Sequence, residues 1–333
     1  MSQKPSQRIG YYPKQTPLES SKPQKHINPL RAGLLLLCVI VFVSCFFLLV
    51  RYGFHILRSR NASRKLETIH AAMVEQPPSS VPTVSPTPSP TSPLSAKPTP
   101  VSANKPVPTA ELWPSTYANN PTLRVSPVFY QLQAQNKDIV GWLKIDGMLE
   151  EAVVQRDNDY YLTHNALKQR SATGALFLDE NCNLDTVPTQ MLIHGHNMKE
   201  GAMFGSLKKY KVKDASFYRQ HPFIDFNTLY ENGRYVIFSV AEVDIRAGKP
   251  DYLPFWQQSR FSNAESFMQY VERAKLLSQY VCKVDVQPGD RLLTLSTCTG
   301  NDDNKRLIVM ARKLRENENE FELNMSILST GDR

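Results

Sequence analysis

The residues best suited to covalent chemistry lie in the C-terminal third of the chain. Cys298 ends the strand-like run Thr-Leu-Ser-Thr-Cys, and Arg306 opens the next apolar run. A hairpin between these runs would place Arg306 beside Cys298. A cysteine thiolate is a nucleophile, and an arginine can stabilise both the thiolate and the oxyanion that forms when sulfur attacks a carbonyl. The alternatives are a small buried cysteine and a solvated arginine at the start of a strand.

Two histidines end another strand-like run about a hundred residues upstream, at His194 and His196. A histidine can accept the thiol proton and later donate a proton to a leaving amine near neutral pH. One such group is sufficient for this chemistry, so one of the two histidines has a structural role. The alternative is a metal site on the His-Gly-His pair, which requires further ligands that we cannot place.

Short β-rich runs must position these residues, and turns rich in Gly, Asn, Asp and Pro separate them. We expect strands at residues 140–145, 151–155, 175–178, 190–194, 235–243, 281–286, 291–297 and 306–313. They do not alternate regularly with helices, which predicts a mainly β fold with a closed or nearly closed barrel. We expect a capped helix from Ser126-Pro127 through Val128, Phe129, Leu132 and Ile139, a short helical stretch from residue 204 to 211, and a helix at 263–279 over the barrel. We interpret this last helix as packing on the barrel; the alternative is that the loop flanking it also shapes a substrate groove.

An apolar run and a proline-rich stretch precede the folded part. Ala32 to Val50 contains 19 residues without a charge, which is long enough to span a membrane as a helix. No cleavage site follows, so we interpret the run as an uncleaved signal anchor. Basic residues on both sides leave the orientation open. The Pro/Ser/Thr-rich stretch from Pro77 to Pro114 indicates an extended linker, and this layout favours a catalytic domain outside the cell membrane.

We therefore divide the chain into a cytoplasmic basic N-terminus (1–31), a transmembrane signal anchor (32–50), a juxtamembrane segment with the linker (51–125) and a folded domain (126–333). Residues 1–70 hold 11 Lys/Arg against 2 Asp/Glu, whereas residues 71–333 hold 28 against 29. The folded domain thus lacks the basic excess of a nucleic-acid-binding protein. The five cysteines show no zinc-like spacing, and Cys182 and Cys282 either pair or remain free thiols.

Several motifs, in this order and spacing, resemble those of the class B sortases of Gram-positive bacteria. They are Val140-Gly-Trp-Leu-Lys-Ile145, Asp157-Asn-Asp-Tyr-Tyr-Leu162, Gly195-His-Asn-Met198, Met203-Phe-Gly-Ser-Leu207, and Thr294-Leu-Ser-Thr-Cys298 with the downstream Arg306. The resemblance covers residues 128–313. It implies a closed eight-stranded sortase barrel with N-terminal helices and a helix before the last strands. It also implies a membrane-anchored cysteine transpeptidase, a thiol protease of the cell wall, with no metal or organic cofactor.

By this resemblance, Cys298 is the nucleophile, His196 is the general acid and base, and Arg306 holds the substrate and its oxyanion. Three further residues would line the groove for the sorting signal: Ser296, Asn158 and Leu162. The enzyme would cleave a C-terminal sorting signal of a secreted protein after a threonine. It would then transfer the protein to an amine of a peptidoglycan precursor or to a lysine of a pilin.

The chain also departs from the family pattern at two places near the expected site. His194 stands where many relatives have an aromatic residue, and Thr299-Gly300 follows the cysteine where some members carry an acidic residue. The sequence therefore does not name the group that orients His196. The alternatives are a cysteine endopeptidase that releases its acyl group to water, a pilin-polymerising sortase, and a non-catalytic wall-associated binding module.

Overall fold

The structure of the chain, a computed structural model, describes residues 29–75, 112–212, 214–300 and 302–328. The expected proline-rich linker lies almost wholly outside these residues. Contacts divide the chain after Val50, so that the barrel and everything packed on it belong to the unit that begins at Arg51. A single long helix, α1 (Pro29–Val74), begins in the first unit and ends in the second. Its apolar part is long enough to cross a membrane, as the sequence predicts.

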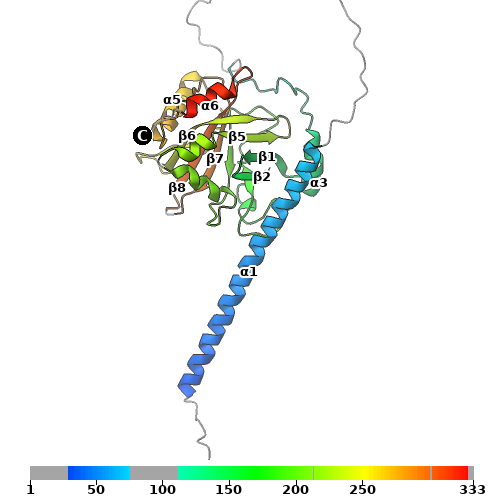
Figure 1. The fold of residues 1–333 in the computed structure, drawn as a ribbon, viewed down its shortest axis with the longest axis vertical. Helices are drawn as coiled ribbons and strands as arrows, with labels where there is room; N and C mark the ends of the chain where they lie inside the picture. The colour runs from blue at the N-terminus through cyan, green and yellow to red at the C-terminus, as the bar shows by residue number, and fades with distance from the viewer. Residues whose placement is uncertain (1–28, 76–111, 213, 301, 329–333) are drawn as a thin grey trace, which may run out of the picture. The chain divides into compact units, whose positions relative to one another are not determined.

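The described residues of the second unit form a closed barrel of eight strands (Figure 1). The strands are β1 (Ile139–Ile145), β2 (Leu149–Val154), β3 (Leu176–Leu178), β4 (Gln190–His194), β5 (Phe223–Thr228), β6 (Arg234–Asp244), β7 (Leu292–Cys298) and β8 (Lys305–Lys313). Their order around the barrel is β1-β2-β3-β4-β7-β8-β6-β5. The β2–β3 and β4–β7 pairs are parallel and the others are antiparallel. The expected closed barrel is confirmed.

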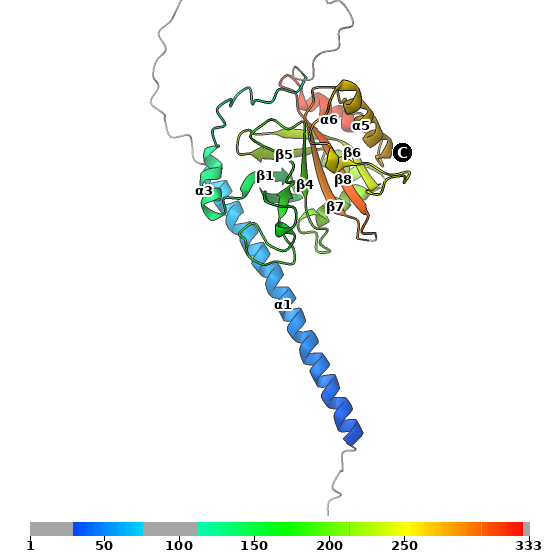
Figure 2. The same ribbon diagram turned by 180° about the vertical axis from the view of Figure 1, so that it is seen from behind.

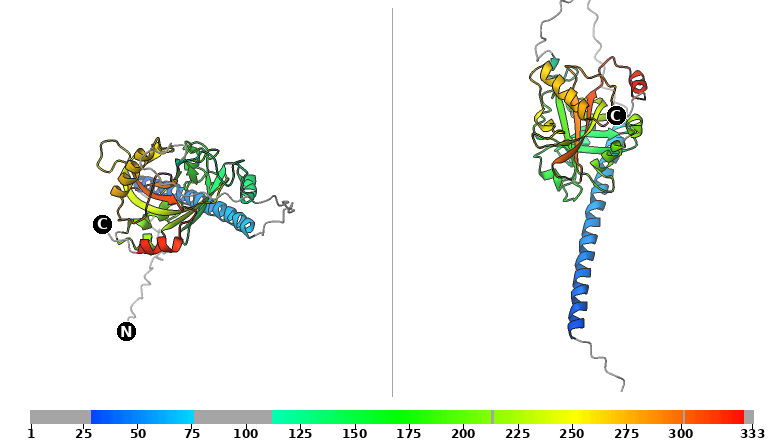
Figure 3. Two further views of the ribbon diagram at one scale, coloured as in Figure 1. Left: turned by 90° about the horizontal axis from the view of Figure 1, so that it is seen from above. Right: turned by 90° about the vertical axis from the view of Figure 1, so that its left-hand side faces the viewer.

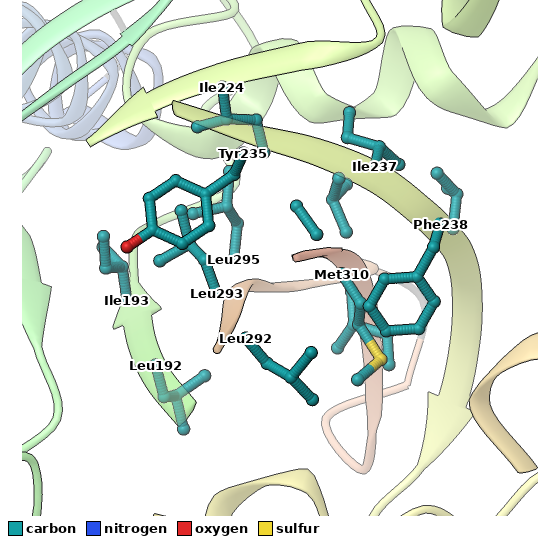
Figure 4. Packing of buried hydrophobic residues seen from close by; sticks show 14 of the residues in the cluster. Leu192, Ile193, Ile224, Tyr235, Ile237, Phe238, Leu292, Leu293, Leu295 and Met310 are labelled. Atoms are coloured by element: carbon teal, nitrogen blue, oxygen red, sulfur yellow. The ribbon is translucent and has the colours of Figure 1, made fainter. Parts of the chain in front are cut away.

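Strands β4, β5, β6, β7 and β8 contribute aliphatic and aromatic side chains to one buried cluster (Figure 4). Strand β5 alternates between partly exposed and buried residues, as expected for a strand with one face on the core. Strand β7 is instead buried along its whole length until Cys298. A central strand that is covered on both faces reads as a nearly continuous apolar run. Only its last residue therefore reaches solvent.

The second half of α1 and the helix α3 (Pro127–Gln135) pack against the outside of β1 and β2 (Figure 2). Leu66 of α1 and Leu132 of α3 are buried there beside Trp142 of β1. Each such side chain removed from water stabilises the packing by about 1.5–3 kcal/mol. Residues 51–74, which we expected to be a juxtamembrane connection, are thus helical and lie on the barrel.

The helix α5 (Ala264–Leu277) covers another side of the barrel, next to β6 (Figure 3). It begins where the Asn263 side chain accepts a hydrogen bond from the Ser266 amide at 2.8 Å. Phe267, Tyr270 and Val271 form its buried stripe. The remaining short elements are η1 (Tyr160–Leu162), η2 (Phe204–Lys211), α4 (Ser216–Gln220), η3 (Phe255–Gln257) and α6 (Glu320–Leu328).

Three details of the structure differ from the sequence-based expectations. Residues 281–286 are not a strand, because the barrel is closed and offers no edge for pairing. Side chains bind their carbonyl groups instead: Lys275 donates to Val284 O at 2.8 Å and Arg312 to Asp285 O at 2.5 Å. Strand β5 was not expected. The helix that follows Ser126 ends at Gln135, so that Ile139 begins β1 rather than closing the helix.

Candidate active site

Two parallel neighbouring strands, β4 and β7, present the expected catalytic residues at the same end of the barrel. His194 lies opposite Ser296 in their register, and the Gly195 amide donates to Ser296 O at 3.2 Å. His196 and Cys298 are each two residues beyond that pair. The Asn197 side chain also donates to Cys298 O at 2.9 Å. Parallel pairing therefore brings together two loops that are about a hundred residues apart in the sequence.

The expected hairpin between β7 and β8 is confirmed, and its register places Cys298 directly opposite Arg306. Cys298 is exposed, whereas Ser296 and Thr297 before it are buried. Arg306 is partly exposed. Its Nη1 group donates to Asp303 O at 2.6 Å and to Lys305 O at 3.1 Å. Among the described residues, its Nε and Nη2 groups have no protein partner, so they are available to a substrate oxygen.

His196 is held in one orientation by a backbone carbonyl. Its Nε2 atom lies 2.8 Å from Leu162 O. A carbonyl oxygen only accepts hydrogen bonds, so Nε2 carries the hydrogen. In the neutral ring, Nδ1 is then the nitrogen with a free electron pair. The Leu162 carbonyl thus orients His196 and fixes its tautomer, a task that the sequence left unassigned.

A cavity of about 380 Å³ opens at this end of the barrel. All six expected site residues line it, together with seven others. They are Cys298, His196, Arg306, Ser296, Asn158 and Leu162, with Phe177, Asp179, Asn181, His194, Gly195, Trp256 and Thr297. The volume is typical of a site for a small ligand or a few peptide residues. The structure therefore brings the predicted residues to one opening.

Similarity to known proteins agrees with this geometry. The model of the Sortase domain family matches residues 143–314, which is more than half of the chain. The chain belongs to the sortase family. Sortase B of Listeria monocytogenes is 36% identical over 186 residues, which are 55% of this chain and 72% of the relative. Sortases are cysteine transpeptidases, so this sortase is one as well.

Solved sortase B structures have the same barrel. The Staphylococcus aureus sortase B–substrate complex is 28% identical, with a TM-score of 0.51 over 58% of this chain and 87% of that one. A sortase B complexed with triglycine is also 28% identical, with a TM-score of 0.52 over 59% and 89% of the two chains. In both cases the similarity extends beyond the fold to the sequence, of which 28% is identical. The expected class B resemblance is confirmed.

One wall of the cavity in this sortase is polar, because His194 replaces the aromatic residue expected there. Its Nε2 atom lies 2.9 Å from Oδ2 of Asp179, a carboxyl group that is 6% exposed. Burial alone raises the pKa of Asp179, but hydrogen bonds from His194 and Asn181 outweigh this effect and lower the pKa. Asn158 also donates to Asp179 Oδ2, at 3.1 Å. Asn158, expected to contact substrate, is thus anchored to this wall.

Four residues that line the cavity were not named from the sequence: Phe177, Asp179, Asn181 and Trp256. Trp256 lies in η3, in the loop before α5, which the sequence offered only as a second possibility for shaping a groove. Asp179 follows strand β3 in a polar turn. Functional side chains are often presented where a strand meets a loop, so this position could have marked Asp179 as a site residue. The other cysteines are not candidates for the nucleophile. Cys182 and Cys282 do not pair in a disulfide bond, and burial raises the pKa of Cys182 to about 12.

A metal site on the His-Gly-His pair is not supported by the part of the chain that the structure describes. No group of three or more His, Cys, Asp or Glu side chains is arranged there to bind a metal ion. His194 uses its Nε2 atom for Asp179, and His196 uses its own for Leu162. The two histidines therefore have different hydrogen-bond partners. The sequence analysis expected one of the two to have a structural role.

Proposed function

We propose that this sortase cuts a secreted protein after a threonine near its C-terminus and joins the new end to an amine. The observation that supports this most directly is the register that sets Cys298 opposite Arg306, at the cavity that His196 also lines. A nucleophile, a proton carrier and a fixed cation at one opening are what acyl transfer through a thioester requires.

Acylation starts when Nδ1 of His196 takes the thiol proton of Cys298, because Nε2 is occupied by the Leu162 carbonyl. The sulfur attacks the carbonyl carbon of the threonine, and negative charge develops on the carbonyl oxygen. The open N–H groups of Arg306 stabilise this oxyanion. When the intermediate collapses, the C–N bond breaks. His196 then gives its proton to the leaving amine, and the acyl group remains on sulfur as a thioester.

Deacylation repeats these steps with a new nucleophile. An acceptor amine attacks the thioester carbonyl, its proton passes to His196, and the C–S bond breaks as Cys298 regains a proton. If water enters instead, the product is a free carboxylic acid and the enzyme is an endopeptidase. Ser296, Asn158 and Leu162 line the cavity where the sorting signal would bind, and we assign them to substrate binding.

We assign the amine to a peptidoglycan precursor, with a pilin lysine as the second candidate. The similarity to a sortase B that was solved with triglycine, a molecule with a free amino group, supports an amine acceptor. The apolar part of α1 is compatible with a single-pass anchor in the cell membrane. We propose that the catalytic domain lies outside the membrane, because both the acceptor and the secreted substrates are found there.

The test uses the full-length protein and a peptide library with a fixed threonine, incubated with and without triglycine. We expect mass spectrometry to find an acyl adduct on Cys298 and products joined to triglycine. Cys298→Ala should abolish cleavage, and Arg306→Ala should slow it by about 10²-fold. Cys182→Ala is the matched control, since this thiol is buried, and it should retain activity.

Two results would contradict the proposal. Cleavage that persists in Cys298→Ala would show that another group is the nucleophile. Products that always end in a carboxylic acid, at every triglycine concentration, would make the enzyme an endopeptidase rather than a transferase.

A further inference from the structure

A short chain of buried hydroxyl groups connects helix α1 to the loop that precedes β3. Thr173 and Ser59 are each only 3% exposed, and the Thr173 hydroxyl donates to the Ser59 hydroxyl at 2.5 Å. Ser171 lies 2.9 Å from the same Thr173 oxygen. A second contact joins His55 Nδ1 and Arg170 O at 3.1 Å. The helix that continues from the apolar segment is thus hydrogen-bonded to this loop at two points.

The same loop holds the catalytic histidine. Gly174 follows Thr173 in a left-handed conformation with φ of +59°, and a Cβ atom there would lie 2.5 Å from Tyr161 O and 3.0 Å from both His196 Cδ2 and Leu162 O. The Ala175 amide donates to Tyr161 O at 3.0 Å. The backbone around residue 174 is therefore packed directly against the His196 ring and the carbonyl that receives its Nε2–H.

The first half of this loop is attached to the segment between α3 and β1: the hydroxyl of the buried Tyr161 donates to Asp138 Oδ2 at 2.7 Å, and Asn136 donates to Tyr161 Oη and to Ala166 O, each at 2.9 Å. It contains no strand between β2 and β3, and η1 is its only helical turn among the described residues. The Ser171 amide donates to Thr163 O at 2.9 Å, which closes the loop on itself without attaching it to the barrel. The contacts of Ser59 and His55 hold its second half, at Thr173 and Arg170, from the side of α1.

The hydroxyl of Ser59 is not needed to attach the helix. Ala62 and Leu66, on the same face of α1, are 4% and 1% exposed, and Leu66 belongs to the apolar cluster on β1 and β2. Loss of the Ser59 hydroxyl should therefore leave α1 on the barrel. What it removes is the hydrogen bond that ties Thr173 to α1, so that the Thr173 hydroxyl keeps partners only within its own loop, Ser171 at 2.9 Å and Gly174 O at 3.5 Å.

We infer that Ser59 and Thr173 are positioning residues for His196, so that the helix next to the membrane anchor sets the tautomer of the catalytic ring. The inference rests on the role proposed above for His196. The hydroxyl pair holds the backbone around Thr173, and the amides of Ser171 and Ala175 donate to Thr163 O and Tyr161 O, on either side of Leu162. The Leu162 carbonyl in turn selects the Nε2–H form of His196. Residues that hold the hydrogen-bond partner of a histidine commonly fix which ring nitrogen carries the proton.

The test uses full-length protein in detergent micelles, with Thr173→Val and Ser59→Ala as two independent variants. We expect each to lower kcat for peptide cleavage by about tenfold with KM within about twofold, since small displacements of a catalytic group strongly affect rate. Thr173→Ser keeps the hydroxyl and should restore most of the loss. Thr68→Ala is the matched control, because this hydroxyl of α1 donates only to Arg64 O within the helix.

A spectroscopic readout separates positioning from general loss of structure. In protein labelled with ¹⁵N-histidine, His196 is assigned by its absence in His196→Ala. We expect the Nε2–H tautomer in the wild type and in Thr68→Ala, but a mixture of tautomers and a shifted pH–rate profile in Thr173→Val and Ser59→Ala.

An unchanged tautomer and pH profile in both variants would overturn the inference, whether or not kcat falls. The proposed function fails by a different result, namely wild-type turnover in His196→Ala. In that case the tautomer measurement still decides whether the hydroxyl pair positions the ring.

Discussion

Gly174 is the position where a single methyl group should disturb catalysis most directly. An alanine there would have to adopt a left-handed backbone, which costs about 1–2 kcal/mol. Its Cβ would lie 2.5 Å from Tyr161 O, whereas ordinary contacts begin at 3.4 Å. The two groups must therefore separate by about 0.9 Å, and the same Cβ would also lie 3.0 Å from His196 Cδ2 and from Leu162 O.

The expected effect of Gly174→Ala follows from these distances. A displacement of about 1 Å at a catalytic group can reduce the rate by about 10²-fold, so kcat/KM for peptide cleavage should fall by about that factor. Overpacking adds about 1–3 kcal/mol to the backbone strain, so the free energy of unfolding should fall by about 2–5 kcal/mol. Peptide cleavage and urea unfolding of the full-length protein measure the two quantities.

Gly248→Ala separates the two causes. Gly248 has a similarly positive φ of +84°, but no atom lies within 4 Å of its Cβ position. It should lose only about 1–2 kcal/mol of stability, from the left-handed backbone alone, and it should keep its activity. If Gly174→Ala and Gly248→Ala showed equal activity, the close packing around His196 would not matter for catalysis and the reasoning would be wrong.

Two further predictions concern the groups near the site and under α1. His194→Ala should lower kcat/KM only several-fold, because His194 is bound to Asp179, whereas His196→Ala should cost about 10²-fold or more; equal losses in steady-state assays would mean that the wrong histidine was assigned. Burial raises the pKa of Glu151 from 4.5 to about 7, so the folded protein keeps a proton that the unfolded chain loses, and stability falls as the pH rises from 4.5 to 7. Glu151→Gln should therefore stabilise the protein by up to about 3 kcal/mol at pH 8 and by little at pH 5, and a pH-independent difference in urea unfolding would contradict this.

The strands were predictable where their apolar runs were unbroken. Strand β4 has the expected bounds, and β7 and β8 differ by single residues. The pairing of Cys298 with Arg306 followed from these runs and the short loop between them. Residues 281–286 were also expected to form a strand, because apolar and charged residues alternate from Cys282 to Val286. They form no strand, because a closed barrel leaves no edge to pair with. Whether a segment finds a free edge depends on the topology of the whole barrel, so the local sequence does not reveal it.

The support of the site was less predictable than its chemistry. Cys298, His196 and Arg306 could be found from residue type and motif, but the group that orients His196 is the backbone carbonyl of Leu162, and carbonyl groups leave no trace in residue identity. The segment at residues 51–74 was expected to be part of the connection between the anchor and the folded domain. Only packing reveals that Leu66 is buried.

The place of β7 between β4 and β8 also sets when the enzyme becomes able to react. His196, Asn158 and Leu162 are synthesised well before the nucleophile, and until Leu292–Cys298 has been made, β4 has an unpaired edge. Pairing across so long a stretch of chain is slow to form. A chain that ends before β7 therefore lacks Cys298 and leaves β4 unpaired on that side, so the three residues proposed for catalysis, Cys298, His196 and Arg306, meet only once the last strands have joined the barrel.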